Sequence, residues 1–562
     1  MFTMDIKKQK VLLFASVCVI AMYIGYSFVG MDRLIGVFKQ DNYYMGVPTI
    51  SQEEVIQLTQ GKEKTRLEEG LFFSYNKVPL DVEEQTVYIS QSMVKTEWEG
   101  FFELEQSYEK AGYNLYFLED DFLDDKEEAI KQGHKFSLYV IGEDYYQLNI
   151  VFSGLGVMSI SKIYEYPKEI VDYWDDPDQY IFENQIEYLG EVTVLAADIE
   201  SSYQMIQGYV KYHLKGSASI DFPKKSYAIT FVDAGGKDVA VPILGMESNA
   251  KWKLNSLYTD NTLLREKSAC DIWQIIDADN TLADNGSFDA EYIELIIDNE
   301  YVGVYLLVEP VNGQTLELNK NDILYKCVNW NVAKQQNIEE SIANGWRVQL
   351  PFRIKYPKVI TDYQVVWSPI KDFSNVFWTD GDKGELALEQ RIHVSNVIDV
   401  DIFLEICALD DNNYKNIYYA AHENGDGTYI MTLHPWDFDL SFGHRYVHDT
   451  MEAYEFYTDP VYNCDLSLLD KVIDENPQIA VTLYNTYMRY RQTILSDKNI
   501  EEIIRTNWEH LERSGAYLRN LQMWKTEHGD TTIDSVLQFT KDRLMYTDSV
   551  YQEQYGEQVL DK

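Results

Sequence analysis

The sequence predicts an α+β protein: a large α+β domain ends in helices and is preceded by a small β-rich module and an N-terminal transmembrane helix. Three observations support this prediction. Short β-patterned runs fill the first half of the chain, helix-periodic stretches follow, and one uncharged apolar run lies near the N-terminus. With 562 residues, 45% hydrophobic and 14% aromatic, the chain is long enough for two or three folded parts with sizeable cores.

The charge balance limits the possible partners. Lys and Arg contribute 48 positive charges and Asp and Glu 92 negative ones, a net charge of −44. A surface of this sign repels a phosphate backbone. We therefore expect no nucleic-acid partner.

The N-terminus has the pattern of a membrane anchor. Residues 11–31 carry no charged side chain and reach the ~20 residues that a helix needs to cross a bilayer. Lys7, Lys8 and Lys10 precede this run, and such basic residues stay on the cytoplasmic side. The sequence thus predicts a cytoplasmic tail over 1–10, a single-pass helix over 11–31 and an extracytoplasmic remainder. A cleaved signal peptide is the alternative, but the run is longer than its usual apolar core and no A-x-A-like site ends it.

Two further segments precede the large domain. Residues 32–69 are polar and mixed, which is typical of a stalk, with a helix start at the capping-box sequence Ser51-Gln-Glu-Glu. Residues 70–154 form the predicted β-rich module, in which β-patterned runs at 86–89 and 136–141 alternate with turns and acidic segments. The large domain then covers 155–562.

Within the large domain, strands are predicted first and helices later. The pattern predicts a buried strand from Gly156, a helix over 262–276, a hairpin with arms 293–297 and 301–308, and helices over 500–555.

The most informative stretch runs from Asp401 to His448. A helix-compatible segment, 401–409, leads into a polar cluster that contains Asp411 and Asn416. Two strands, 417–421 and 429–433, are joined by Asn-Gly-Asp-Gly, a strong hairpin signal, and Asp437 follows directly. The hairpin therefore brings two acidic clusters together at one end.

This layout has the spacing of a protein kinase site. In kinases an Asp aligns the acceptor hydroxyl. An Asn five residues later and the Asp of an Asp-Phe-x segment after the hairpin hold magnesium over the ATP phosphates. Asp411, Asn416 and Asp437 have this spacing, and oxygen ligands suit magnesium. A bend from Lys215 to Tyr227 carries the paired lysines Lys224 and Lys225 into a strand, and such a bend can approach and neutralise phosphate.

Five blocks in order resemble the CotH kinase family, atypical protein kinases named for a spore-coat protein and found as secreted or spore-associated enzymes. The resemblance spans about Leu155 to Gln552. The blocks are the bend from Gly216 with Phe222–Tyr227, then Leu263–Lys267, Tyr301–Glu309, Phe352–Pro357 and Pro435–Gly443.

The resemblance implies an atypical protein-kinase-like domain with a defined set of site residues. Lys225 would contact the ATP phosphates, with Lys224 as the alternative. Asp411 would be the catalytic Asp, and Asn416 and Asp437 the ligands of magnesium or manganese. Glu309 would lie either beside the adenosine or at a structural strand end. The implied activity is transfer of the ATP γ-phosphate to hydroxyls of an envelope or surface protein.

Two other classes of function stay open at this stage. A metal-dependent hydrolase is possible because His434, Asp437, Asp439, His444 and His448 lie close in sequence, with the last two at helical i, i+4 spacing. A non-catalytic, membrane-anchored adhesion or binding protein with a kinase-like fold would suit the acidic, tyrosine-rich composition.

Overall fold

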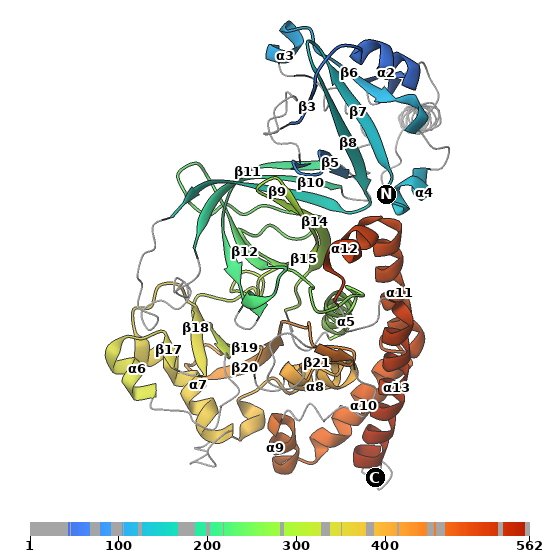
Figure 1. The fold of residues 1–562 in the computed structure, drawn as a ribbon. Coiled ribbons are helices and arrows are strands. Elements are labelled where there is room, and N and C mark those ends of the chain that lie inside the picture. Colours follow the sequence, from blue (N-terminus) through green and yellow to red (C-terminus); the bar gives the residue numbers. More distant parts are fainter. Residues whose placement is uncertain are drawn as a thin grey trace, which may run out of the picture.

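The computed structural model describes residues 43–44, 47–67, 79–90, 104, 106–121, 126–166, 186–197, 203–216, 219–280, 286–327, 338–349, 351–377, 387–412, 415–446, 454–456, 467–526 and 532–556. These residues form a front sheet, a closed barrel and a lower part made of a second sheet and helices, stacked in that order (Figure 1). The α+β class predicted from the sequence is confirmed.

The front module, residues 43–153, is built on an eight-stranded sheet with the order β1-β2-β6-β7-β8-β5-β4 and with β3 paired to β8. Apolar side chains such as Phe117, Leu138 and Ile150 are fully buried in its core. Its elements are β1 (Tyr43–Tyr44), β2 (Val47–Ile50), α2 (Gln52–Thr59), β3 (Lys64–Thr65), β4 (Leu80–Asp81), β5 (Thr86–Ser90), α3 (Gln106–Lys110), β6 (Asn114–Leu118), α4 (Lys126–Lys131), β7 (Lys135–Ile141) and β8 (Tyr145–Ser153).

Residues 47–67 belong to this module, whereas the sequence predicted a stalk there. β2 pairs with β6 and β3 with β8, and Val55 and Leu67 are buried in the cores of the module. The predicted capping box is present: the Ser51 hydroxyl accepts a bond from Glu54 N, and the Glu54 carboxylate accepts one from Ser51 N at 2.8 Å. The buried side chains of Val55 and Leu67 attach this segment to the sheet. The polar residues around them made the segment look like a stalk in the sequence.

The barrel has seven strands in the closed order β10-β11-β12-β13-β15-β14-β9, and parallel pairing of β14 with β9 closes it. Met158, Val194, Leu254 and Leu295 fill its interior. Its strands are β9 (Gly156–Glu165), β10 (Tyr188–Ala197), β11 (Tyr203–Lys215), β12 (Ser226–Val232), β13 (Lys251–Asn255), β14 (Ala290–Ile297) and β15 (Glu300–Val308). The predicted strand from Gly156 and the predicted hairpin β14–β15 are confirmed.

The front module and the barrel share a wall. The first five residues of β9 are buried on both faces, because Val157 packs into the module core while Met158 and Ile160 pack into the barrel core. Only Gly154 and Leu155 separate β8 from β9. A Cβ on Gly154 would lie 2.5 Å from Ser514 Cα, so this passage requires glycine.

Polar and aromatic contacts strengthen this junction. The rings of Tyr88 and Tyr301 stack at 4.5 Å, and Tyr301 N donates to Asp81 Oδ2 at 3.1 Å. The guanidinium of Arg519 donates two bonds, of 2.8 and 2.9 Å, to the fully buried carboxylate of Glu294. Arg519 lies on a C-terminal helix, so this ion pair also ties that helix to the barrel.

The lower part holds a five-stranded sheet with the order β17-β18-β16-β19-β20. Helix α8 is buried on nearly all sides, as expected for a helix that is apolar around its whole circumference. The elements are α5 (Arg265–Asp279), β16 (Ile323–Cys327), α6 (Ile338–Asn344), β17 (Val348–Gln349), β18 (Phe352–Tyr356), α7 (Tyr363–Phe377), α8 (Val394–Cys407), β19 (Ile417–Glu423), β20 (Tyr429–Pro435), β21 (His444–Tyr446) and β22 (Tyr454–Phe456).

The C-terminal helices run along one side of the barrel and the lower part (Figure 1). α12 contacts β15, α11 contacts α5, and α13 contacts α8. These helices are α9 (Ser467–Glu475), α10 (Gln478–Gln492), α11 (Asp497–Arg513), α12 (Ala516–Trp524) and α13 (Ile533–Tyr551). The helices predicted over 500–555 are thus confirmed for the residues that the structure describes.

The membrane segment predicted over 11–31 lies outside the described residues. Among the helices that the structure does describe, none combines the length and the apolar character needed to cross a bilayer.

Candidate active site between the barrel and the lower sheet

The hairpin β19–β20 carries the predicted acidic clusters at one end. Asp411 and Asn416 precede β19, and Asp437 follows β20. Asn416 Nδ2 donates to Asp411 Oδ2 at 2.6 Å, and Lys415 Nζ lies 3.3 Å from the same oxygen. The structure therefore brings the Asp and the Asn together as the spacing predicted.

A buried asparagine fixes the two ends of the hairpin to each other. Asn412 is fully buried, and its Nδ2 donates to Asn416 O at 3.2 Å and to Trp436 O at 2.8 Å. Trp436 N in turn donates to Asn416 O at 3.1 Å. Asn416 and Asp437 both have left-handed backbones, with φ of 59° and 68°. Such strained residues occur at functional sites where the surroundings hold them in place.

Phe438 anchors the segment between Asp437 and Asp439. Its ring is fully buried and lies 5.0 Å from the ring of Phe403 on α8 and 5.6 Å from that of Phe288. Because the neighbouring acids flank a side chain that is locked in the core, their positions are set by packing rather than by a free loop.

Several carboxyl groups crowd this end of the hairpin. Burial, and then the charge of Asp437, raises the pKa of Asp439 well above its usual range. Burial likewise raises the pKa of Asp411, which Lys415 partly opposes. Burial, followed by the charge of Asp437, raises the pKa of Glu266 on α5 to about 7. Burial and mutual repulsion thus disfavour the charged forms of these acids, and a bound cation would relieve that repulsion.

The barrel supplies the positive side of the site. Lys215, at the end of β11, lies 3.9 Å from Asp437 Oδ1 and donates to Asn255 Oδ1. Asn255 Nδ2 donates to Glu266 Oε1 at 2.5 Å. A polar chain therefore runs from the lower sheet through the barrel to the start of α5.

Lys253 on β13 is the second barrel lysine at the site. Its Nζ lies 4.1 Å from the centre of the Trp436 ring. Trp436 directly precedes Asp437 in the sequence. Burial, and then the charge of Lys215, lowers the pKa of Lys253 to about 7, while Asp437 and Glu266 oppose that shift. An ammonium group held in this environment is well suited to an anionic ligand.

The two lysines predicted for phosphate binding directly precede β12, and both ammonium groups bond to other parts of the chain. Lys224 is buried: its Nζ donates to Val304 O at 2.5 Å and to Asn520 Oδ1 at 2.8 Å, and it lies over the Tyr305 ring. Lys225 Nζ donates to Ile220 O at 2.8 Å. These contacts place Lys224 in the junction between the barrel and α12.

Glu309 lies where the chain leaves β15 for the lower part. It is buried, its carboxylate accepts a bond from Asp289 N at 3.0 Å, and its own N–H donates to Asp289 O at 2.9 Å. Burial raises the pKa of Glu309 to about 7. This geometry suits the structural strand end, which was one of the two roles that the resemblance implied for Glu309.

Arg265, at the start of α5, pairs with an acid. Arg265 and Asp260 form an ion pair in which both side chains are buried. Burial favours the neutral acid, but the Arg265 guanidinium, His444 and the hydrogen bonds from Thr262 and Arg265 N together outweigh this effect and keep the pKa of Asp260 below its usual value. The pair fixes the N-terminal end of the helix that carries Glu266.

The histidines of the hydrolase alternative are arranged differently from the expected zinc helix. His444 begins strand β21, so the helical i, i+4 spacing is wrong, and His448 lies outside the described residues. His444 Nδ1 lies 3.1 Å from Asp439 O, and His434 Nε2 lies 2.8 Å from Thr432 Oγ1. Within the part of the chain that the structure describes, no three His, Cys, Asp or Glu side chains are arranged to hold a metal.

The donor set nevertheless fits magnesium in the way kinases bind it. Magnesium is held by one or two carboxylates together with substrate phosphates, not by a complete cage of protein ligands. Asp437 and Asn416 provide oxygen atoms beside the crowded carboxyl groups of Asp411 and Asp439. A site completed by nucleotide phosphates therefore agrees with the residues present.

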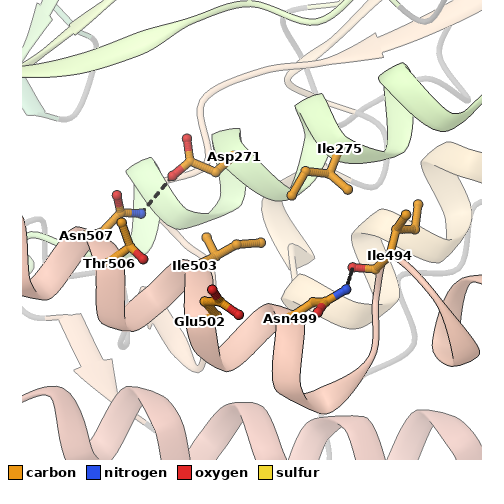
Figure 2. A pocket seen from close by; sticks show the side chains of 8 residues that line it. All are labelled: Asp271, Ile275, Ile494, Asn499, Glu502, Ile503, Thr506 and Asn507. Carbon is orange, nitrogen blue, oxygen red and sulfur yellow. Dashed lines mark hydrogen bonds between the residues drawn. The ribbon is translucent and has the colours of Figure 1, made fainter. Parts of the chain in front are cut away.

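A separate hollow of about 390 Å³ lies between α5 and α11 (Figure 2). Ile275, Ile494 and Ile503 contribute apolar surface. On its polar side, Asn507 Nδ2 donates to Asp271 Oδ2 at 2.7 Å. Its lining begins beyond Glu266 along α5, so the hollow is distinct from the acidic cluster.

The fold and the site together define an α+β protein with carboxylates and lysines gathered between a barrel and a lower sheet. A comparison with protein families matches residues 212–547 to the family described as CotH kinase protein. This match covers more than half of the chain, which therefore belongs to the CotH kinase family. A comparison with curated proteins found no match.

Sequence reasoning missed three members of the site. Lys253, Asn255 and Glu266 come from a strand and a helix that are far from the hairpin in sequence. Glu266 stood inside a block that was recognised, but no local spacing connects it to Asp437. One signal in the sequence could have identified Lys253 and Glu266: a strand that carries a lysine is followed by a helix that carries a glutamate.

Proposed function

We propose that this chain is a metal-dependent protein kinase that transfers the γ-phosphate of ATP to hydroxyl groups of a protein. One observation carries the proposal. Lys215, Lys253 and Glu266 from the barrel side interact with Asp437, which the hairpin holds next to Asp411 and Asn416.

The barrel side matches the order of parts in protein kinases. Kinases carry a lysine on the third strand of their N-terminal part and a glutamate on the following helix, and both are needed to hold the nucleotide phosphates. β13 carries Lys253, and α5, the next helix, carries Glu266. We assign Lys253 to the phosphates, with Lys215 as a second cation. This role takes the place of the one expected for Lys225 or Lys224.

The hairpin side would act on the acceptor and the metal. Asp411 would align the acceptor hydroxyl and receive its proton, and its bond from Asn416 orients the carboxylate. Asn416 and Asp437 would hold magnesium or manganese, with Asp439 as a further nearby carboxylate. When bound, the metal offsets charge on the phosphate oxygens. Catalysis would then consist of positioning and electrostatic stabilisation.

The acceptor class and location come from the sequence alone. The apolar run over 11–31 and the lysines before it support a single-pass anchor with the bulk of the chain outside the cytoplasm. We therefore propose an envelope or surface protein as the acceptor. Protease treatment of intact cells, scored with an antibody to α13, tests this topology: protection of α13 until the cells are lysed would contradict it.

Labelled ATP provides the direct test of activity. The full chain, incubated with magnesium or manganese and an envelope extract, should label a protein. Asp411→Asn, Asp437→Asn and Lys253→Met should each lower the rate at least about 100-fold. Asp426→Asn is the matched control, because Asp426 lies in the exposed hairpin turn and bonds only within it. Labelling by Asp437→Asn at the parent rate would refute the kinase assignment.

Binding measurements separate the two other classes of function. A nucleotide binder should gain about 2.7 kcal/mol of stability with MgATP at a hundredfold excess over Kd. No shift in melting temperature would favour an adhesion or binding protein. Stoichiometric zinc in the purified chain, with no response to MgATP, would favour a hydrolase.

A further inference from the structure

Trp436 is contacted by ammonium groups from two separate parts of the molecule. Lys253 Nζ of the barrel lies 4.1 Å from the ring centre, and Lys326 Nζ of β16 lies 3.8 Å from it. Each contact is a favourable cation–π interaction. Because both ammonium groups approach one ring, however, they also stand close enough to repel each other.

More positive charge surrounds this pair. β16 and β18 are antiparallel neighbours, with Lys326 opposite Arg353. Lys326 also lies over the ring of Tyr418, 5.8 Å from its centre. Burial first, and then the charges of Lys253, Lys355 and Arg353, lower the pKa of Lys326. In a chain with 48 basic and 92 acidic side chains, this gathering of basic groups is unusual, and an anion bound among them would offset their mutual repulsion.

The kinase arrangement does not account for these additional groups. One lysine on the barrel side meets the phosphates in protein kinases, and Lys253 fills that place. Lys326 and Lys355 come instead from β16 and β18, two strands of the lower sheet. Asp437 is the acid that opposes the pKa shift of Lys326, and it belongs to the metal side of the site.

We propose that Lys326 and Lys253, which both contact Trp436, form with Lys355 of the neighbouring strand β18 a subsite that binds a phosphate group. This inference rests on the proposed function, because it places the subsite next to the nucleotide. The ammonium groups are hydrogen-bond donors without acceptor capacity, which suits a phosphate oxygen. The phosphate belongs either to the nucleotide chain or to the acceptor, beside its reactive hydroxyl.

Inorganic tripolyphosphate is the first probe, and its binding to the full chain is measured by calorimetry. Lys326→Met keeps the length of the side chain and removes its charge, so it should weaken tripolyphosphate binding about tenfold or more, as expected for a lost charge-assisted hydrogen bond. Lys326→Arg should retain most of the affinity. Lys320→Met is the matched control, since Lys320 is exposed just before β16, and its affinity should equal that of the parent.

A second pair of measurements identifies the source of the phosphate. If Lys326→Met also weakens MgATP but leaves adenosine binding unchanged, the nucleotide occupies the subsite. If MgATP binds as in the parent while orthophosphate binds more weakly at saturating MgADP, the acceptor occupies it. Both results support the subsite.

Unchanged binding of tripolyphosphate and of orthophosphate by Lys326→Met would overturn the inference, and the contact with Trp436 would then be structural. This failure is distinct from failure of the kinase proposal. The latter is decided by phosphate transfer in Asp437→Asn, a variant that leaves Lys326 and Trp436 in place.

Discussion

Two lysines of the barrel, Lys224 and Lys253, are both shielded from solvent but have different partners. Lys224 donates to Val304 O and Asn520 Oδ1, so its ammonium group is satisfied within the protein. Lys253 lies over an aromatic ring and near Asp437, at the site. Burial of a lysine therefore does not identify a phosphate ligand, and the partners of the ammonium group are decisive.

Lys224→Met should leave nucleotide binding nearly unchanged. Methionine has a similar length and packs well in apolar surroundings, and it removes a charge that burial disfavours. We expect the Kd for MgATP to stay within about twofold of the parent value, in contrast to Lys253→Met. Calorimetric titration of both variants checks this prediction. A loss of affinity in Lys224→Met equal to that in Lys253→Met would return the phosphate role to Lys224.

His444 should make the fold sensitive to acid. Burial, and then Arg265, lowers its pKa to about 4, from an ordinary value of 6.5. The unfolded chain binds the proton more readily, so the stability due to neutral His444 is complete above pH 6.5 and is lost as the pH falls through 4. The full effect is about 3 kcal/mol.

The corresponding measurement is urea unfolding of the parent and of His444→Gln at several pH values between 7 and 4. Glutamine does not titrate, so the free energy of unfolding of His444→Gln should fall by about 2–3 kcal/mol less than that of the parent over this pH range. Parallel pH profiles for the two proteins would contradict this assignment of the proton.

At the scale of elements, the hairpin β19–β20 organises the site because Asn412 joins its two ends. Asn412→Ala would leave Asn416 O and Trp436 O without this donor in a buried region. We expect a loss of about 2–3 kcal/mol in unfolding free energy and a fall in the rate of phosphate transfer at temperatures where the variant stays folded. Denaturation and transfer assays on the same preparation measure both.

Asn424→Ala is the control for this hairpin. Its side chain bonds to Thr428 in the exposed turn, so its loss should cost less than about 1 kcal/mol and leave transfer unchanged. If Asn412→Ala transferred phosphate at the parent rate, the link between the two ends would have no part in positioning Asp411 and Asp437.

The hairpin and its acids could be predicted from sequence because their signals are local. The Asn-Gly-Asp-Gly turn fixes the register, and the register brings Asp411 and Asn416 next to Asp437. The partners from the barrel could not be predicted in the same way. Lys215 and Lys253 on the barrel and Glu266 on α5 reach the hairpin only because these elements pack against the lower sheet, and no local sequence pattern encodes that packing.

Over the whole molecule, the front module and the barrel behave as one packed body. Val157, Leu195, Ile296 and Tyr301 belong to the barrel strands but pack into the core of the module. The sequence predicted a β-rich unit before the large domain, but separate polar and acidic segments concealed that the two share a core. Their boundary is therefore a packed interface and not a linker.

Removal of the front module should prevent stable folding of the remainder. A chain that begins at Leu155 would expose the four apolar side chains of the barrel strands that pack into the module core. It would also lose the Tyr88 ring that stacks on Tyr301, next to the ion pair of Glu294 and Arg519. We expect aggregation, seen as loss of the monomer peak in size-exclusion chromatography. A chain that begins at Tyr43 keeps every described contact and should remain monodisperse. A soluble, cooperatively unfolding chain from Leu155 would contradict the shared core.

The passage through Gly154 and Leu155 has a mechanical consequence. Only two residues connect β8 to β9, so there is no flexible linker between them. β9 is paired along its length within the barrel wall. Tension applied to the N-terminal end would therefore travel from strand to strand into that wall. Under load, we expect the front module and the barrel to unfold together in one event and not one after the other.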